Sequence, residues 1–175
     1  MKTHFIMTPV SDAEIKKINA GDEVIISGKI YTARDAAHAR MVDGIKRGEA
    51  PPFDFNGRIV FYAGPSPAGP GRVIGSVGPT TAGRMDAYAP FLIERGLKIM
   101  IGKGKRSVEV IEAIKKNNGI YLAAIGGAAA LLSECVKEAR IIAYGDLGAE
   151  AVYELIVEDF PTVAAVDHKG NSVYK

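Results

Sequence analysis

Short apolar segments of strand length alternate with amphipathic helical segments through the middle of this chain. Apolar residues fill 59–63 and 99–101, and Val108, Ile111 and Ile114 recur at the spacing of one helical face. Strands and helices in this order form parallel strands whose connecting helices cover the sheet. The C-terminal third reads mostly as strand, so we expect an α/β fold with a mixed sheet that is partly barrel-like.

The expected elements are assigned from periodicity, capping residues and turn signals. Strands are predicted at 23–30, 58–63, 73–77, 98–101, 119–125, 140–144, 152–158 and 163–166. Helices are predicted at 35–46 and 85–95, after the capping residue Ser107, from the capping box at Ser11 to about Asn19, and around Cys135 after a small-residue turn at 126–130. No long linker divides the chain, so we expect a single domain over residues 1–175.

Composition narrows the function classes. Apolar residues make up 47% and charged residues 24% of the chain, which is typical of a folded soluble protein. The 22 basic residues are interleaved with 20 acidic ones, so we expect no nucleic-acid partner. No apolar run is long enough to span a membrane and no signal peptide is recognisable, so we expect a cytoplasmic protein without a membrane partner.

Metal-binding residue types are sparse. Cys135 is the single cysteine, which excludes an internal disulfide and any cysteine-rich metal or iron–sulfur site built by this chain alone. His4, His38 and His168 lie far apart without neighbouring ligand types, so no metal ligand is predicted. Cys135 is predicted to be a core thiol and His168 to be exposed in a turn.

The run from Gly78 to Asp86 combines two hydroxyls, an arginine and an acid behind a Gly-Pro turn. Proline ends the preceding extended stretch, and Thr80 or Thr81 then has the residue type that caps a helix. Such a helix start attracts anions, and Arg84 adds a bidentate carboxylate binder one turn later. The alternative is an ordinary capped helix without a ligand.

Three cations follow predicted strands: Arg34, Arg84 and Lys103. The carboxyl ends of parallel strands lie at one edge of a sheet, where ligands usually bind. Two arginines and a lysine suit a small dianion such as a dicarboxylate or a phosphate. Nucleotide motifs fail, because Lys103 lacks P-loop spacing and the Gly64–Gly71 loop carries prolines in place of backbone donors. The alternative is three solvated basic residues at the ends of elements.

Several of these segments, in this order, resemble the β subunit or C-terminal domain of the class I iron–sulfur-dependent fumarases and the related L-tartrate dehydratases. The most specific is Gly-Pro-Thr-Thr-Ala-Gly-Arg-Met-Asp at 78–86. The others are 32–40, Tyr-Ala-Gly-Pro at 62–65, Gly-Lys-Gly at 102–104, Gly-Gly-Ala-Ala at 126–129 and the tail 164–170. The similarity runs from about residue 5 to the C-terminus.

The resemblance implies a division of labour between two chains. It implies a swivelling β/β/α fold for this chain, which would be inactive alone. A fumarase α subunit would supply three cysteines to a [4Fe–4S] cluster whose open iron binds substrate. The pair would form a hetero-oligomer such as α2β2 and hydrate fumarate reversibly to L-malate.

Residue roles carry over onto the matching positions. Arg34, Arg84 and Lys103 would hold the substrate carboxylates, and Thr80 would exchange the carbon-bound proton. Thr81, Asp86 and His38 are weaker candidates for orienting these groups; the alternative for Asp86 and His38 is that they are polar residues at helix ends.

Two other functions stay open. The Thr-Thr-Ala-x-Arg-Met-Asp form favours fumarase, but an L-tartrate dehydratase β subunit is an alternative within the same class. A non-catalytic anion-binding or assembly module is the alternative from another class.

Overall fold

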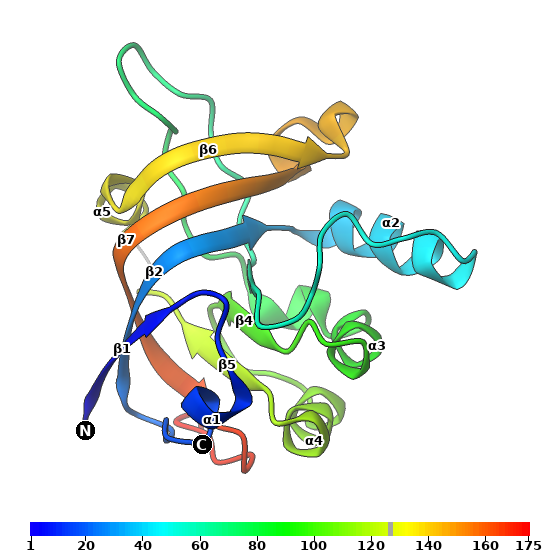
Figure 1. Cartoon of the computed structure of the whole chain (residues 1–175), viewed down its shortest axis with the longest axis vertical. Coiled ribbons are helices and arrows are strands. Elements are labelled where there is room, and N and C mark those ends of the chain that lie inside the picture. The colour runs from blue at the N-terminus through cyan, green and yellow to red at the C-terminus, as the bar shows by residue number, and fades with distance from the viewer. Residues whose placement is uncertain (126–127) are drawn as a thin grey trace.

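The computed structural model describes residues 1–125 and 128–175, and their strands form one sheet (Figure 1). The strands are β1 (Thr3–Met7), β2 (Glu23–Thr32), β3 (Ile59–Phe61), β4 (Ile99–Gly102), β5 (Ile120–Ala123), β6 (Val136–Ala143) and β7 (Val152–Val166). The helices are α1 (Asp12–Ile15), α2 (Asp35–Lys46), α3 (Ala89–Glu94), α4 (Val108–Asn117) and α5 (Ala129–Glu134), with 3-10 helices η1 (Ala82–Met85) and η2 (Gly145–Glu150). The predicted turn at 126–130 lies partly outside the described residues.

The sheet curls until it closes on itself. Its order is β1-β2-β3-β4-β5-β7-β6, and β2 also pairs with β7, so β2, β3, β4, β5 and β7 form a closed ring. The contacts β2–β3, β3–β4 and β4–β5 are parallel, whereas β7 is antiparallel to both β5 and β2. The predicted mixed, partly barrel-like α/β fold is confirmed.

The core consists of two apolar clusters on opposite faces of the strands. Ile59, Phe61 and Ile101 belong to one cluster, and the intervening Val60 and Met100 belong to the other. The second cluster also contains the buried faces of α2, α3 and α4, which lie together on one side of the sheet (Figure 1). Because successive strand residues point to opposite faces and both faces are covered, these strands read as continuous apolar runs.

The predicted strands differ from the structure in several places, and β6 for example begins at Val136 rather than at residue 140. Residues 152–158 and 163–166 belong to one strand, β7, which absorbs an irregularity at Asp159 (φ 52°) instead of ending there. Residues 73–77 are not a strand; they belong to a loop whose base is tied by hydrogen bonds between Ser66 and Ser76. β1 was not predicted, because it lies at the sheet edge and only Ile6 of its five residues is buried.

Most helix signals are confirmed and the bounds of two helices are corrected. The Ser11 capping box and the Ser107 cap both form, the latter by accepting a hydrogen bond from the Val110 N–H. The first helix ends at Ile15 rather than near Asn19, and the helix predicted from residue 85 begins only at Ala89. No described helix has the length and apolarity needed to cross a membrane.

Two predictions about solvent exposure differ from the structure. Cys135 follows α5 as its cap residue and is only partly buried against the core, so it is not a fully buried thiol. His168, predicted to be exposed, is half-buried, because its turn packs back beneath β7 and the buried Asp167 holds that turn through the Lys169 N–H.

Candidate functional site

The parallel strands place two of the predicted cations at the same edge of the sheet. Arg34 lies two residues beyond the end of β2, and Lys103 directly follows β4. β3 lies between these strands and is parallel to both, so all three carboxyl ends face the same way. Arg34 is also the N-cap residue of α2.

The segment with the two threonines lies between Tyr62 and Lys103, the residues that directly follow β3 and β4. The Thr80 N–H donates to the Tyr62 carbonyl (2.6 Å), and the Thr80 carbonyl accepts from the Lys103 N–H (3.3 Å). The Ala82 N–H in turn donates to the Lys103 carbonyl (2.8 Å), which makes a parallel bridge between Thr81 and Lys103. The backbone therefore fixes Thr80 and Lys103 as neighbours.

This close approach requires a residue without a side chain at the end of β4. A Cβ on Gly102 would lie 2.9 Å from the Tyr62 ring and 3.1 Å from the Ala82 Cβ. Both distances are shorter than ordinary van der Waals contact, so any larger residue would push the two segments apart. Gly102 therefore permits the close packing of these two segments. In the sequence, the only sign of this role is its place in the Gly-Lys-Gly run.

The predicted helix start is present but short, and it is not capped by a side chain. Thr81 occupies the cap position of η1, a four-residue 3-10 helix, and its hydroxyl makes no capping hydrogen bond. The backbone of Thr80 and Thr81 is instead used in the pairing with Lys103. The prediction of a threonine-capped helix was therefore wrong, although η1 does carry Arg84 toward the site.

A single carboxylate links the two predicted arginines. Arg84 Nε donates to Asp35 Oδ1 (2.9 Å), and Arg34 Nε lies 3.8 Å from Asp35 Oδ2 and 3.7 Å from Glu150 Oε1. Asp35 thus brings together two guanidinium groups from residues that lie far apart in sequence. Sequence reasoning missed Asp35, because an acid in the first turn of a helix is the usual complement to the helix dipole.

The polar groups around Arg34 are not fully satisfied. Arg34 Nε and Asp35 Oδ2 are both buried, and neither has a hydrogen-bond partner among the described residues. Buried polar atoms are normally paired, so this donor and acceptor, which lie 3.8 Å apart, are free to take a further hydrogen-bond partner. The side chain of Arg84 is more open, at 53% exposure, so it is available to a ligand.

His38 contacts the backbone of Arg34, and Asp86 contacts Arg106 and Ser107 rather than a predicted cation. His38 is buried, with its Nδ1 2.8 Å from the Arg34 carbonyl oxygen and its ring edge-on to Tyr62. Burial lowers the pKa of His38 to about 4, helped by the positive charge of Arg106, so the imidazole is neutral at neutral pH. Asp86 contacts Arg106 and the Ser107 N–H, and neither of these contacts reaches a predicted carboxylate binder directly.

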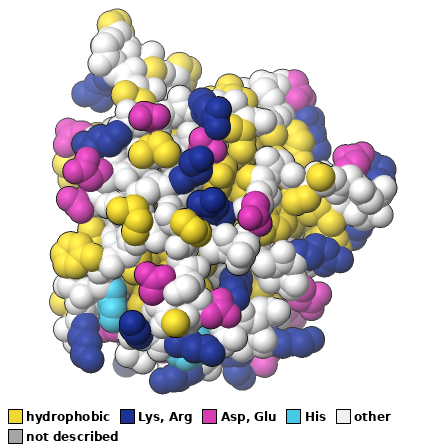
Figure 2. Space-filling model, in the orientation of Figure 1, with side chains coloured by type: hydrophobic (Ala, Val, Ile, Leu, Met, Phe, Trp, Pro, Cys, Tyr) yellow, Lys and Arg dark blue, Asp and Glu magenta, His cyan; other side chains and the backbone are white. Residues whose placement is uncertain are grey.

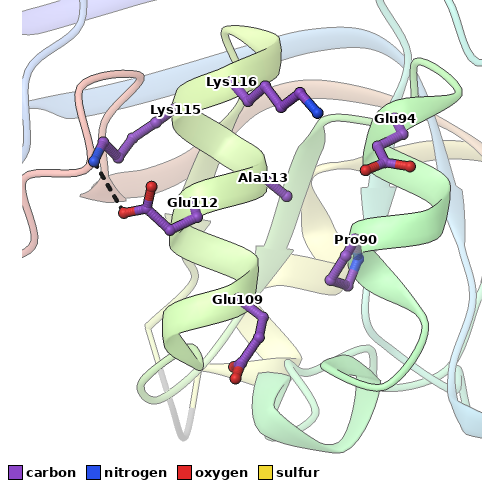
Figure 3. A pocket seen from close by; sticks show the side chains of 7 residues that line it. All are labelled: Pro90, Glu94, Glu109, Glu112, Ala113, Lys115 and Lys116. Atoms are coloured by element: carbon purple, nitrogen blue, oxygen red, sulfur yellow. Dashed lines mark hydrogen bonds and ion pairs between the residues drawn. The ribbon is translucent and has the colours of Figure 1, made fainter.

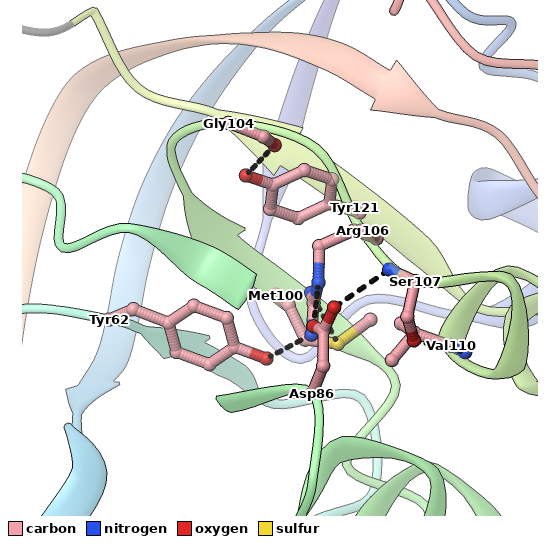
Figure 4. A network of polar contacts seen from close by, with 8 residues as sticks. All are labelled: Tyr62, Asp86, Met100, Gly104, Arg106, Ser107, Val110 and Tyr121. Atoms are coloured by element: carbon pink, nitrogen blue, oxygen red, sulfur yellow. Dashed lines mark hydrogen bonds and ion pairs between the residues drawn. The ribbon is translucent and has the colours of Figure 1, made fainter. Parts of the chain in front are cut away.

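Arg106 is a buried cation that the sequence did not single out (Figure 4). Its Nε donates to Asp86 (2.7 Å), and its guanidinium lies between the rings of Tyr62 and Tyr121. Burial opposes its charge, yet Tyr62 and Asp86 outweigh that effect and raise the pKa of Arg106. In the sequence, Arg106 follows Lys103 and Lys105 in one basic run, and nothing in that run distinguishes it from the two lysines. In the structure, both lysines are exposed and Arg106 is buried.

Neither the distribution of charged side chains on the surface nor the position of the hollow between α3 and α4 identifies this site by itself. Lys and Arg side chains are mixed with Asp and Glu over the face shown in Figure 2. A hollow of about 530 Å³ lies between α3 and α4 (Figure 3), and none of its lining residues is a predicted site residue. The described residues contain no group of three His, Cys, Asp or Glu side chains placed to hold a metal ion.

This chain is similar to proteins of one known family. The family model described as "Fumarase C-terminus" matches residues 3–175. "Fumarate hydratase 2" of Leishmania major is 41% identical over 163 residues, which cover 92% of this chain and 29% of the relative. "Fumarate hydratase class I, aerobic" of Escherichia coli K12 is 39% identical over 165 residues, which cover 93% of this chain and 30% of the relative.

A third relative has about the size of this chain. "Putative L(+)-tartrate dehydratase subunit beta" of Methanocaldococcus jannaschii is 38% identical over 177 residues, which cover 98% of this chain and 91% of the relative. The chain thus spans about a third or less of the fumarate hydratases that it matches but nearly all of this subunit. From the family match and these identities, the chain belongs to the fumarase C-terminus family.

Proposed function

We propose that this chain forms the dicarboxylate-binding half of a hydro-lyase active site. The observation that carries the proposal is the union of two structural links at one sheet edge. One is the backbone pairing of Thr80 with Lys103, and the other is the Arg84–Asp35–Arg34 cluster. The names of the fumarate hydratase relatives support hydration of fumarate to L-malate as the reaction.

In this proposal the cations bind the substrate carboxylates. A guanidinium donates two parallel hydrogen bonds to a carboxylate, and an ammonium adds a mobile third contact. Removal of a proton beside a carboxylate builds extra negative charge on that carboxylate. The transition state therefore carries more negative charge on this carboxylate than the bound substrate does, and Arg34, Arg84 and Lys103 stabilise it more strongly. Stronger stabilisation of the transition state than of the bound substrate accelerates the reaction.

Thr80 is the proposed proton-exchange residue. Its backbone is held on both sides, by Tyr62 and by Lys103, so its hydroxyl starts from a fixed Cα position beside the cations. A threonine hydroxyl is a weak base, and it needs neighbouring positive charge to take a proton. We assign the orienting role to Asp35 as well as to Thr81, Asp86 and His38.

The described residues of this chain do not fit a [4Fe–4S] cluster. The single cysteine is partly buried beside α5, and no three potential ligands come together. We therefore derive no step through a cluster here and propose that a partner α subunit with three cluster cysteines holds it, in a hetero-oligomer such as α2β2. The word "subunit" in the name of the M. jannaschii relative supports an assembly of more than one chain.

A second substrate is favoured by one observation. The chain matches the tartrate dehydratase subunit beta over 91% of that relative, so dehydration of L-tartrate is the alternative reaction. Both substrates are four-carbon diacids and would use the same cations. Turnover of fumarate, L-malate and L-tartrate by the enzyme assembled with its α subunit decides between them.

Arg84→Ala in that assembled enzyme tests the proposal itself. Loss of a charge-assisted contact to the transition state raises the activation free energy for kcat/KM by about 2–4 kcal/mol, which lowers kcat/KM roughly 30-fold to 1000-fold. Arg95→Ala is the matched control, because Arg95 lies on the Phe91 ring of α3. If the assembled enzyme with Arg84→Ala keeps wild-type activity, that result would support the non-catalytic anion-binding or assembly module instead.

A further inference from the structure

We propose that the buried ion pair of Arg106 and Asp86 fixes where the end of η1 that carries Arg84 lies relative to the segment that carries Lys103. Arg106 is then a positioning residue for dicarboxylate binding. This inference rests on the proposed function, because it concerns how the same cations are held.

Backbone hydrogen bonds join the two segments at one end. Lys103 pairs with Thr80 and Ala82, and the chain then turns through Gly104, which has a left-handed conformation (φ 85°). The Tyr121 hydroxyl donates to the Gly104 carbonyl (3.0 Å) and holds this turn from below. These contacts fix the turn to β5 and to Ala82 at the start of η1, but they do not reach the end of η1 that carries Arg84.

Arg106 supplies the missing cross-link (Figure 4). It lies three residues after Lys103, and Asp86 lies two residues after Arg84, so their pairing joins the distal ends of both segments. Arg106 Nε donates to Asp86 Oδ1, and the other carboxylate oxygen accepts from the Ser107 N–H, each at 2.7 Å. One acid therefore fixes both the cation and the start of α4.

The surroundings of the guanidinium leave it little freedom. Its side chain is fully buried, and one terminal nitrogen donates to the Tyr62 hydroxyl (3.2 Å). Tyr62 is also the residue whose carbonyl accepts from Thr80, so a single residue contacts both the buried cation and the proposed proton-exchange residue. Burial raises the pKa of Tyr62, which therefore stays a neutral partner.

An ion pair at this place is better explained by geometry than by stability. Replacing a buried ion pair with apolar residues of similar volume is often neutral or stabilising, whereas removing one partner alone is strongly destabilising. Hydrogen bonds to a charged fork are directional, and apolar contact is not. An apolar pair would therefore fill the space without fixing where the Arg84 end of η1 lies relative to Arg106.

The deciding variant is Arg106→Met combined with Asp86→Leu, made in the enzyme assembled with its α subunit. Three quantities are measured: the thermal midpoint, kcat and KM for fumarate and L-malate, and hydrogen exchange of the Lys103 and Ala82 amides. Arg140→Met is the control, because it removes an exposed ion pair with Glu154 on β6 and β7. The control is expected to keep all three at wild-type values.

We expect the double variant to remain folded with a lower thermal midpoint, because the Ser107 N–H loses its acceptor, to exchange both amides faster, and to lose kcat/KM on the order of 100-fold. A folded double variant with wild-type exchange and kcat/KM would overturn the proposal. If it does not fold, Arg106→Lys decides, since it keeps the charge but loses the fork. Wild-type exchange and kcat/KM in that variant overturn the proposal, and faster exchange with lower kcat/KM supports it.

The same experiment separates this inference from the proposed function. If the wild-type enzyme converts none of the diacids, the proposed function fails, and the amide exchange rates still decide whether Arg106 positions the turn. If the wild type is active and the variants keep wild-type exchange and activity, only the positioning role fails.

Discussion

The burial of His38 predicts a specific loss of stability in mild acid. The imidazole is 1% exposed in the first helical turn after Arg34. Because the Arg34 carbonyl oxygen can only accept, Nδ1 of His38 carries the hydrogen of that 2.8 Å contact. A second proton would make a buried cation close to Arg106, and burial accordingly lowers the pKa of His38 to about 4.

The size of the effect follows from proton linkage. The folded pKa is depressed below the ordinary value of 6.5, so the unfolded chain takes up a proton first as the pH falls. The free energy of unfolding therefore declines by about 1.4 kcal/mol for each pH unit between about 6.5 and 4. The full decline from this one residue is about 3 kcal/mol, which is a large part of the stability of an ordinary domain.

Urea unfolding of the wild type and of His38→Gln at several pH values between 7 and 4 measures this decline. Glutamine keeps an N–H donor for the Arg34 carbonyl but does not titrate, and His4 and His168 are common to both proteins. We expect the stability difference between the two proteins to shift by about 3 kcal/mol across this range, with the wild type losing more. Parallel curves over this range would refute the reasoning.

A separate acid effect comes from Asp22 and lies at lower pH. Backbone N–H groups of Asn19 and Lys2 donate to its carboxylate and lower its pKa, with a further contribution from His4. Its stabilising contribution is present above the ordinary value of about 3.8 and is lost as the pH falls below it. Both proteins share this effect, so it does not enter their difference.

Three further predictions concern the site. Thr80→Ala is expected to lower kcat more than KM in steady-state assays of the assembled enzyme, and unchanged turnover would remove Thr80 from the reaction. Gly102→Ala is expected to destabilise the chain by about 1–3 kcal/mol in urea unfolding, because the new methyl group meets the Tyr62 ring at 2.9 Å; Gly69→Ala, with no atom within 4 Å, serves as its control, and equal effects would contradict the close approach. Asp35→Ala is expected to lower kcat/KM more than Asp35→Asn, which keeps an oxygen to accept from an arginine, and the reverse order would rule out the linking role of Asp35.

Local signals predicted the elements that carry the site. The helix at 35–46 has the predicted bounds, and the caps at Ser11 and Ser107 form because each hydroxyl satisfies a free N–H of the first turn. The strands ending before Arg34 and Lys103 were also predicted, since both faces of the sheet are covered and the apolar runs are continuous. The predicted roles of Thr80, Arg34, Arg84 and Lys103 stay predictions.

Signals that depend on partners distant in sequence were misread or missed. The segment 73–77 has the apolar residues of a strand, but it finds no strand neighbour and lies in a loop closed by Ser66 and Ser76. The break expected near Asp159 is absent, because β7 keeps hydrogen-bonded neighbours on both sides of that irregularity. Propensity is a weak guide where pairing with a remote strand decides the outcome.

The sequence by itself determined most of the helices and central strands, the chain's single thiol and the segments that carry positive charge, because these depend on neighbouring residues or on composition alone. Only the tertiary structure decided that the sheet closes through β2 and β7, that Asp35 links two arginines and that Arg106 is buried against Asp86. The physical reason is that burial and ion pairing depend on residues brought together from distant parts of the chain. Arg106 and Lys105 are adjacent in sequence, yet only Arg106 is buried.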